Sequence, residues 1–314
     1  MSTENPLRKV RNLLVNTYEK DTYNHLLKCE EKYKIKINTK VGVSDVFTIN
    51  TFTTPTDLYK YALMAHFDFV ITDTDFNPLF AVEFDEIGHF DDPEIIDRDK
   101  KKRKLCELFK FSLLRITQEY YNKSHGGLTI LEYIIGYWLC DRDIQEAYKN
   151  GEISPDEYID PSMILEMPGH KENMPFWIAK EERIALAKYH NNGVILERLP
   201  SIILCKDAEN NYKMFGCIKV NSTFGFMAEN YLLSQYFRIN ISELLDDLLT
   251  ITIKQLIDQA LAGKMKLQSI DVIIKRAKEF WTNHKEPKFK HSAEWFITAV
   301  ARTEPISKTN EIHH

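Results

Sequence analysis

The chain has 314 residues, enough for about two domains of ordinary size. Hydrophobic residues make up 44% of it and charged residues 28%, a globular composition that excludes an intrinsically disordered chain. The formal net charge of −5 argues against a protein that coats nucleic acid with its whole surface, but it leaves room for local basic patches.

Neither a membrane span nor a secretory signal is expected. No run approaches the roughly 18 apolar residues of a transmembrane helix, and residues 1–6 lack a charged region followed by an apolar stretch. The five cysteines are odd in number and widely spaced, so we expect buried, reduced thiols rather than disulfides or a zinc site. Together these features predict a cytoplasmic protein without a membrane partner.

The first elements of the chain predict an α/β domain. Residues 6–33 carry apolar side chains at helical spacing, as one helix or as two with a break near Asp21, and residues 34–48 read as extended. Residues 66–72 and 79–85 have strand composition. Because a short turn separates them, they should pair as antiparallel neighbours.

A helix and a third strand should follow this hairpin. Asp92 and Pro93 have the features of a helix start, and the helix should run to about Phe109. The strand at 111–116, reached through that helix, should pair in parallel, and an apolar helix at 128–140 should cover the sheet. Residues 1–148 are therefore predicted as one domain with a mixed sheet flanked by helices.

Residues 149–314 are predicted as a second, α+β domain. The boundary is a charged stretch that is rich in proline and glycine. The expected elements are a helix at 176–190, strands at 194–205, 212–220 and 223–228, helices at 241–263 and 268–283, and short helical or irregular segments at the end.

Three acidic residues interrupt the apolar strands of the predicted hairpin. Asp68 lies between Phe67 and Phe69, while Glu83 and Asp85 are two residues apart and so point to the same side of their strand. Burying such acids is costly unless another charge offsets theirs. Oxygen ligands of this kind suit Mg²⁺ or Mn²⁺, so we expect a divalent metal site; the alternative is that these acids cap strand ends and face water.

The following helix should add a cation to this site. Lys102 and Asp99 share a helical stripe with Leu105 and Cys106, which should face the sheet. Lys102 would either reach the carboxylates and stabilise charge on a phosphate, or extend into solvent. Its neighbours are expected on a solvated face that contacts a nucleic-acid backbone: Lys100, Lys101, Arg103 and Lys104.

Four blocks of the first half resemble a known family. They are Phe67-Asp68-Phe69-Val70, then Ala81-Val82-Glu83-Phe84-Asp85 with His89, then Arg98-Asp99-x-x-Lys102, then Leu113-Leu114-Arg115-Ile116. Over roughly residues 15–120 they look like a bacterial family of unknown function in the PD-(D/E)XK, restriction-endonuclease-like superfamily, near the very-short-patch-repair endonucleases. The resemblance implies a mixed sheet flanked by helices and metal-dependent hydrolysis of phosphodiester bonds.

The same resemblance implies roles for single residues. Asp68 matches the first catalytic acid and Glu83 the second, and Glu19 resembles a helix glutamate that approaches the metal in several members. Asp85 stands where the superfamily usually has a lysine, so catalysis would need Lys102 as its substitute. His89 is either a general base or a loop histidine bonded to the backbone. The sequence also departs from the family at residues 85–89, where Asp-Gly or Asp-Ser is typical.

The second half carries a basic segment at residues 264–290. It has eight Lys or Arg residues against three acids, with three aromatic residues, Phe280, Trp281 and Phe289, between them. Such a segment can bind a nucleic-acid backbone and stack on bases, with Lys275, Arg276 and Lys288 as candidate contacts. The alternative is a solvated helix face whose aromatic residues lie in the core.

The sequence thus predicts a metal-dependent nuclease, in a bacterium one with a role in defence or repair. Mg²⁺ or Mn²⁺ would be held by Asp68, Glu83, Asp85 and Glu19, and family analogy favours DNA over RNA as substrate. One alternative is a catalytically degenerate nuclease fold that binds nucleic acid or a protein. Another is a protein whose second half recruits a partner, so that the nuclease acts only in a complex.

Overall fold

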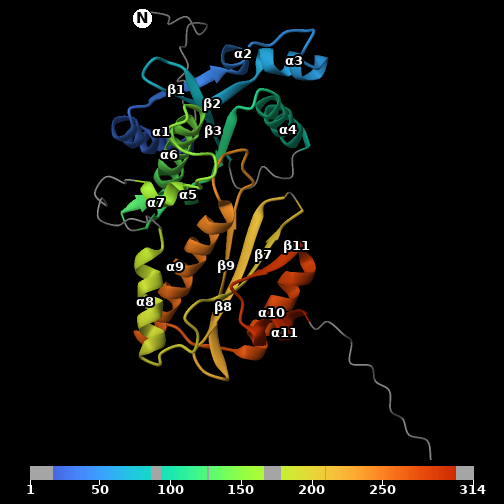
Figure 1. Cartoon of the computed structure of the whole chain (residues 1–314). Helices are drawn as coiled ribbons and strands as arrows, with labels where there is room; N and C mark the ends of the chain where they lie inside the picture. Colours follow the sequence, from blue (N-terminus) through green and yellow to red (C-terminus); the bar gives the residue numbers. More distant parts are fainter. Residues whose placement is uncertain (1–16, 86–92, 126, 166–177, 209, 302–314) are drawn as a thin grey trace, which may run out of the picture. The chain divides into compact units, whose positions relative to one another are not determined.

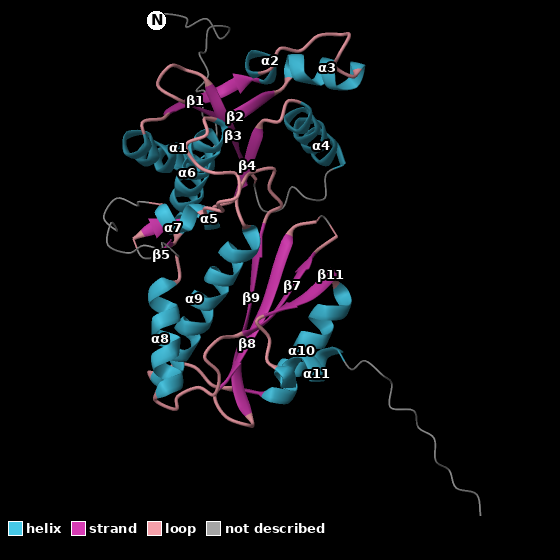
Figure 2. Ribbon diagram, in the orientation of Figure 1, coloured by secondary structure: helices cyan, strands magenta, loops and turns pink. Residues whose placement is uncertain are grey.

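The computed structural model describes residues 17–85, 93–125, 127–165, 178–208 and 210–301 (Figure 1). The chain divides into two compact units: residues 1–176 with Gln235–Ile239, and residues 177–234 with 240–314. Each unit combines helices with a β-sheet, so the predicted mixture of α and β structure is confirmed (Figure 2). None of the described helices is long and apolar enough to cross a membrane.

The first unit is built on a four-stranded mixed sheet in the order β1-β2-β3-β4. β1 (Lys36–Gly42), β2 (His66–Thr72) and β3 (Pro78–Phe84) pair antiparallel, and β3 pairs in parallel with β4 (Ser112–Ile116). The predicted hairpin and the parallel third strand are confirmed. The crossover runs through α4 (Pro93–Leu108), while the predicted helix cap Asp92 lies outside the described residues.

Helices cover both faces of this sheet. α1 (Thr17–Tyr33) and α6 (Ile130–Lys149) lie on one side and α4 on the other (Figure 1). α1 is continuous through Asp21, so the reading with a break there is wrong. α6 begins after Thr129, whose hydroxyl accepts from the Glu132 amide in a capping box, and it continues well beyond the predicted end at residue 140.

Several short elements of this unit were not predicted. Residues 43–46, expected to be extended, form α2 because Val43 turns into the core between the sheet and the neighbouring helices. The other short elements are α3 (Thr56–Met64), α5 (Glu119–Asn122), α7 (Pro161–Ile164) and the two-residue strands β5 (Ser124–His125) and β6 (Leu128–Thr129).

The second unit is a five-stranded antiparallel sheet in the order β10-β9-β8-β7-β11. Its strands are β7 (Ser201–Lys206), β8 (Tyr212–Lys219), β9 (Phe224–Leu232), β10 (Gln268–Ser269) and β11 (Lys285–Lys290). The three central strands match predicted runs. β11 was missed because its sequence, with three lysines and a proline, lacks the apolar pattern of a strand.

Helices also cover both faces of the second sheet. α8 (Lys180–Asn191) and α9 (Ile241–Leu261) lie on one side, and α10 (Ile270–Asn283) and α11 (Glu294–Ala301) on the other (Figure 1). Successive side chains of β8 point to opposite faces of the sheet and contact both helical layers. Phe215 packs on aromatic rings of α10 and α11, whereas the next residue, a glycine, leaves room for a leucine of α9.

The five cysteines are free thiols, as predicted. Four are buried and Cys140 is half-buried. Burial raises the pKa of every one of them, which keeps them protonated and unreactive near neutral pH. No chemistry in the chain is therefore assigned to a cysteine.

A segment from the second half of the chain completes the first unit. The Arg115 amide donates to Gln235 Oε1 at 2.8 Å, and Gln235 Nε2 donates to the Arg115 carbonyl at 2.7 Å. The Leu113 amide donates to the Tyr236 carbonyl at 2.8 Å. This segment therefore satisfies backbone groups on the outer edge of β4, an edge that would otherwise be open to pairing with another chain.

The aromatic ring of Phe237 anchors the same segment. It packs on Phe80 and Trp138, with ring centroids 5.1 and 5.8 Å apart. The structure thus differs from the predicted boundary at residues 148 and 149. The first unit continues to residue 176 and takes Gln235–Ile239 from the second half, a long-range contact that no local sequence pattern announces.

We predict that Gln235→Ala lowers the free energy of unfolding by about 1–2 kcal/mol, because it removes a side chain that satisfies two partly buried backbone groups of Arg115. Hydrogen exchange at the Arg115 amide should accelerate, and urea unfolding should show the loss. Gln255→Ala, an exposed change on α9, is the matched control and should be near neutral. Unchanged exchange at Arg115 would contradict this account of the β4 edge.

Candidate functional site

A pocket of about 710 Å³ opens in the first unit where the ends of α1, α3, β2, β3, α4 and β4 meet. Four of the predicted catalytic or metal-binding acids line it, together with Lys102. The acidic residues of its lining are Glu19, Asp68, Glu83, Asp85 and Asp99. Side chains that are far apart in the sequence therefore converge on one cavity, while His89 lies outside the described residues.

Asp68 and Glu83 face each other where β2 and β3 separate. Backbone pairing of these strands ends at Phe69 and Val82. Beyond that point the Asp68 amide donates to Glu83 Oε1 at 3.2 Å, and the Phe84 amide donates to Asp68 Oδ2 at 3.1 Å. The two carboxylates thus replace the strand ladder, which fixes their positions and opens the mouth of the pocket.

Lys102 is the cation that faces Glu83. Its Nζ is 2.6 Å from Glu83 Oε2, and both side chains are only 13% exposed. Burial raises the pKa of Glu83 to about 7, although Lys102 opposes the shift. Burial alone would lower the pKa of Lys102, but the charge of Glu83 and its other neighbours outweighs burial and raises it. Lys102 therefore reaches the carboxylates rather than solvent, as the helical stripe predicts.

Lys40 is a second buried cation, which the sequence analysis missed. Its Nζ lies 2.8 Å from Glu19 Oε1 and 2.7 Å from Asp68 Oδ1. Burial opposes the charge of Lys40, but hydrogen bonds to Asp68 and Glu19 outweigh burial and raise its pKa. The residue has φ 53° inside β1, a left-handed conformation that costs a non-glycine residue about 1–3 kcal/mol. The only signal in the sequence was its place opposite Asp68 in an antiparallel register.

Arg115 holds the remaining two acids. Its Nη2 donates to Asp85 Oδ1 at 2.9 Å and to Asp99 Oδ2 at 2.9 Å, and its Nε lies 2.8 Å from Asp85 Oδ2. Burial raises the pKa of Asp85, and the charge of Arg115 opposes that shift. Asp85 lines the pocket as expected, but its carboxylate is bound by an arginine from β4. Its role as a metal ligand stays a prediction.

The chemistry of the acid cluster fits a divalent cation. The donors are carboxylate oxygens, which Mg²⁺ and Mn²⁺ prefer. Glu19, Asp68 and Glu83 share two ammonium groups, so the three carboxylates outnumber the cations that pair with them. Burial is the main cause of the raised pKa of Glu83, and the charge of Asp68 adds to it. In the described part of the chain no three His, Cys, Asp or Glu side chains are gathered closely enough to hold a metal as they stand. Lys40 and Lys102 fill the space between the acids.

The side chains of α4 that are predicted to contact a nucleic-acid backbone lie on the solvent side of the helix. Lys100 and Lys104 are exposed. Lys101 pairs with Asp97 at 2.5 Å and Arg103 with Glu107 at 3.0 Å, each one turn away on the same helix. Such exposed pairs are weak and would not prevent contact with a phosphate.

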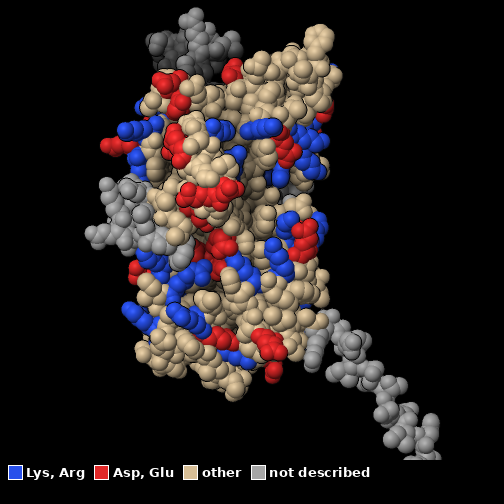
Figure 3. Space-filling view, in the orientation of Figure 1, with Lys and Arg blue, Asp and Glu red and all other residues tan. Residues whose placement is uncertain are grey.

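The aromatic residues of the basic segment pack on one another and on the core of the second unit. Phe280 is buried, and Trp281 stacks on Phe289 with ring centroids 4.4 Å apart, both half-buried against the core under α10. The core alternative is therefore confirmed for Phe280, while contact of Trp281 or Phe289 with a base stays a prediction. On the face drawn in Figure 3, Lys and Arg side chains alternate with Asp and Glu rather than forming one large patch.

The three candidate contacts in this segment differ in their surroundings. Lys275 and Lys288 are exposed. Arg276 is held by Glu229 at 2.6 Å and lies 3.6 Å from Glu279. All three candidates are exposed, as a nucleic-acid contact requires, and Arg276 differs only in being paired with acids of its own unit.

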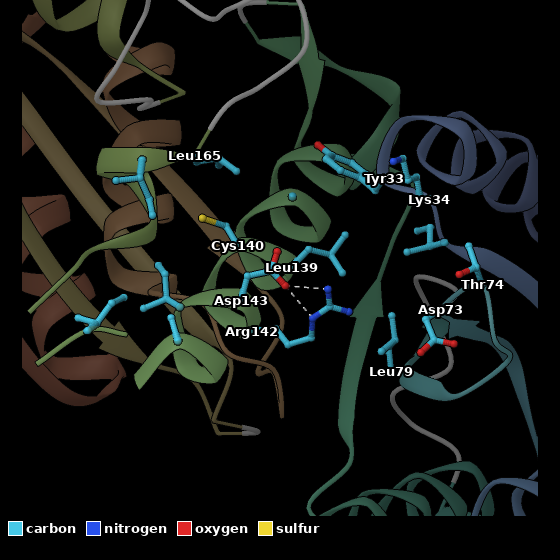
Figure 4. Close-up of a pocket in the computed structure, with 16 residues that line it drawn as sticks. Tyr33, Lys34, Asp73, Thr74, Leu79, Leu139, Cys140, Arg142, Asp143 and Leu165 are labelled. Carbon is cyan, nitrogen blue, oxygen red and sulfur yellow. Dashed lines mark hydrogen bonds and ion pairs between the residues drawn. The ribbon is translucent and has the colours of Figure 1, made fainter. Parts of the chain in front are cut away.

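A second cavity of about 700 Å³ lies in the same unit, between α6, α7 and the start of β1 (Figure 4). Its walls are mostly apolar, and α6 contributes more of the lining residues than any other element. Arg142 pairs with the largely exposed Asp143 at its rim, at 2.7 Å. It gathers no buried acids, so the cavity at Asp68 and Glu83 is the candidate site.

Comparison with known proteins adds one finding. Residues 11–131 match a family described as a protein of unknown function (DUF2726). The matched segment contains every residue that lines the acid pocket. No curated protein and no solved structure matches the chain.

We predict that Lys102→Met destabilises the metal-free protein more at pH 8 than at pH 5. Because burial raises the pKa of Glu83 from 4.5 to about 7, the folded chain holds a proton that the unfolded chain releases. The free energy of unfolding therefore falls as pH rises through that window. Without Lys102 the folded pKa rises further, and ionised Glu83 loses its partner, so the loss at pH 8 should be on the order of 3 kcal/mol.

Urea unfolding in EDTA at the two pH values measures this effect. Lys104→Met is the matched control on the same helix and should change stability by less than about 0.5 kcal/mol. An equal loss at both pH values would show that Glu83 does not depend on Lys102 for its charge.

Proposed function

We propose that the protein is a metal-dependent nuclease that hydrolyses phosphodiester bonds of DNA at the acid pocket. One observation carries the proposal: Asp68 and Glu83 on adjacent strands meet Glu19 of α1 and Lys102 of α4 in a single cavity. Two or more carboxylates beside a buried lysine are the groups that this reaction needs, because it must place a divalent cation and a positive charge around a phosphate.

Each residue has a distinct task in this proposal. Asp68, Glu83 and Glu19 would hold Mg²⁺ or Mn²⁺, which when bound supplies Lewis-acid charge to polarise the phosphodiester. Lys102 would neutralise charge that develops on the phosphate oxygens. Arg115, oriented by Asp85 and Asp99, offers guanidinium donors at the wall of the pocket, a geometry suited to phosphate. His89 stays a candidate general base.

The choice of DNA rests on the resemblance to restriction-endonuclease-like proteins and not on the pocket. The exposed Lys100 and Lys104 of α4 lie on the helix that carries Lys102, so they would contact the phosphate backbone beside the pocket. The second unit would contribute Lys275 and Lys288, or would recruit a protein partner.

A second candidate function has an observation in its favour. Every predicted acid of the pocket is bound by a lysine or an arginine, and Asp85 occupies the position of the superfamily's usual lysine. A nuclease fold that had lost its chemistry could keep such ion pairs as structure. It would then act as a module that binds nucleic acid or a protein.

A cleavage assay separates the two candidate functions. The protein is incubated with plasmid, linear and single-stranded DNA and with RNA, each in the presence of Mg²⁺, Mn²⁺ or EDTA. We expect cleavage of DNA that needs the metal. Asp68→Asn and Glu83→Gln should each reduce the rate at least 100-fold, on the order of 3 kcal/mol in activation free energy, because each removes one charge from the cation site. Circular dichroism should stay unchanged.

Asp97→Asn and Glu107→Gln are the matched controls. They make the same chemical changes on the exposed side of α4 and should keep full activity. Full activity of folded Asp68→Asn would refute the site. Binding of nucleic acid without cleavage under any metal condition would favour the degenerate module.

A further inference from the structure

Lys40 joins two acidic residues that come from different elements. Its ammonium nitrogen lies 2.8 Å from Glu19 Oε1 on α1 and 2.7 Å from Asp68 Oδ1 on β2. The three side chains are between 11% and 18% exposed, so water competes weakly for these contacts. A single ammonium group thus links two carboxylates that both line the pocket.

The backbone at Lys40 is bent to deliver this contact. The register of β1 with β2 pairs Thr39 with Phe69 and Val41 with Phe67, which places Lys40 across from Asp68. No pair is formed at that position, and Lys40 takes φ 53°, a left-handed conformation that is uncommon for lysine within a strand. The unusual backbone angle and the ion pairs occur at the same residue. We infer that the bend in β1 directs the Lys40 side chain toward Glu19 and Asp68.

An ammonium group and a divalent cation would compete for this position. Both need the same carboxylate lone pairs, and two positive charges within about 4 Å of each other repel strongly in a partly buried site. A divalent ion carries twice the charge and accepts several oxygen ligands at once. Lysine has a flexible four-carbon chain that can carry its charge to solvent. The exchange of one for the other is therefore feasible without unfolding β1.

We propose that Lys40 occupies the position of the divalent cation, between Glu19 and Asp68, in the metal-free protein, and that the cation displaces it. The inference rests on the proposed function, because it assigns the position where that cation binds. Its consequence is that the pocket folds without metal, with Lys40 as its internal counter-ion. The observed free energy of metal binding is then the free energy gained when the carboxylates bind the divalent ion, less the free energy lost when they release the lysine.

Metal binding to the full-length protein tests this displacement. Calcium is titrated calorimetrically into the EDTA-stripped wild type and into Lys40→Met, which keeps the length of the side chain and removes its charge. We expect Lys40→Met to bind Ca²⁺ at least tenfold more tightly, about 1.4 kcal/mol, because no internal cation has to leave. In EDTA the same variant should melt at a lower temperature, because Glu19 and Asp68 then repel each other.

Lys36→Met is the matched control. Lys36 lies on the same strand and pairs with Glu30 at 3.3 Å on the surface, so the change removes one ion pair outside the pocket. It should leave Ca²⁺ affinity as in the wild type. Glu19→Gln should weaken Ca²⁺ binding, because it removes one of the two carboxylates that flank the position.

A measurement on the wild type avoids any question of folding. Lysine acetylation by acetic anhydride, read by peptide mass spectrometry, should rise several-fold at Lys40 when Ca²⁺ is added, since the displaced amine becomes accessible. Labelling of Lys36 should not change and serves as the internal reference. Unchanged or reduced labelling at Lys40 in Ca²⁺ would overturn the displacement.

The outcomes separate this inference from the proposed function. Equal or weaker Ca²⁺ binding by Lys40→Met, with a wild type that binds, refutes the displacement and leaves the metal-dependent nuclease in place. Binding by Lys40→Met alone would show that Lys40 excludes the cation from the wild type, which refutes the displacement and favours the degenerate module. Absence of binding by both proteins refutes the displacement and the metal-dependent function together.

Discussion

Carboxylates that are buried at the end of a β-hairpin must have their charge offset, and the first unit is organised around that requirement. Asp68 and Glu83 accept hydrogen bonds from the backbone of the opposite strand, which ends the ladder between β2 and β3. Lys102 from α4 and Lys40 from β1 supply the positive charge. Without these two lysines, the acids would cost several kcal/mol each in free energy of unfolding.

The same arrangement gives the pocket its chemical character. Ion pairs that stabilise the fold also keep acids from four elements, α1, β2, β3 and α4, within one cavity of about 710 Å³. Burial raises the pKa of Glu83 although the charge of Lys102 opposes the shift, so the cost of burying this carboxylate is only partly compensated. Arg115 is held in the same way, because it pairs with two further acids of the pocket. Gln235, from the second half of the chain, fixes its backbone through two hydrogen bonds. Stability and proposed function therefore depend on the same side chains.

Sequence patterns within single elements predict those residues of the site whose placement depends on one helix or one strand. Strand alternation placed Asp68 and Glu83, and the helical stripe of α4 placed Lys102, because each depends on residues within one element. Lys40 was missed because a lysine in a half-polar strand resembles a surface residue, and only the pairing with β2 brings it to Asp68. Gln235 was missed for the same reason, since its partner is 120 residues away. β11 and α2 were missed where tertiary packing overrides weak local preference.

The most direct test of the central claim is a crystal structure of the wild-type protein with Mn²⁺, with anomalous scattering used to locate the ion. The account predicts an anomalous peak in contact with the carboxylates of Asp68 and Glu19, next to Glu83. It also predicts that the Lys40 side chain turns away from both carboxylates while Lys102 stays beside the site. A pocket without an anomalous peak at saturating Mn²⁺, with Lys40 still between Glu19 and Asp68, would contradict it and leave the acids with a purely structural role.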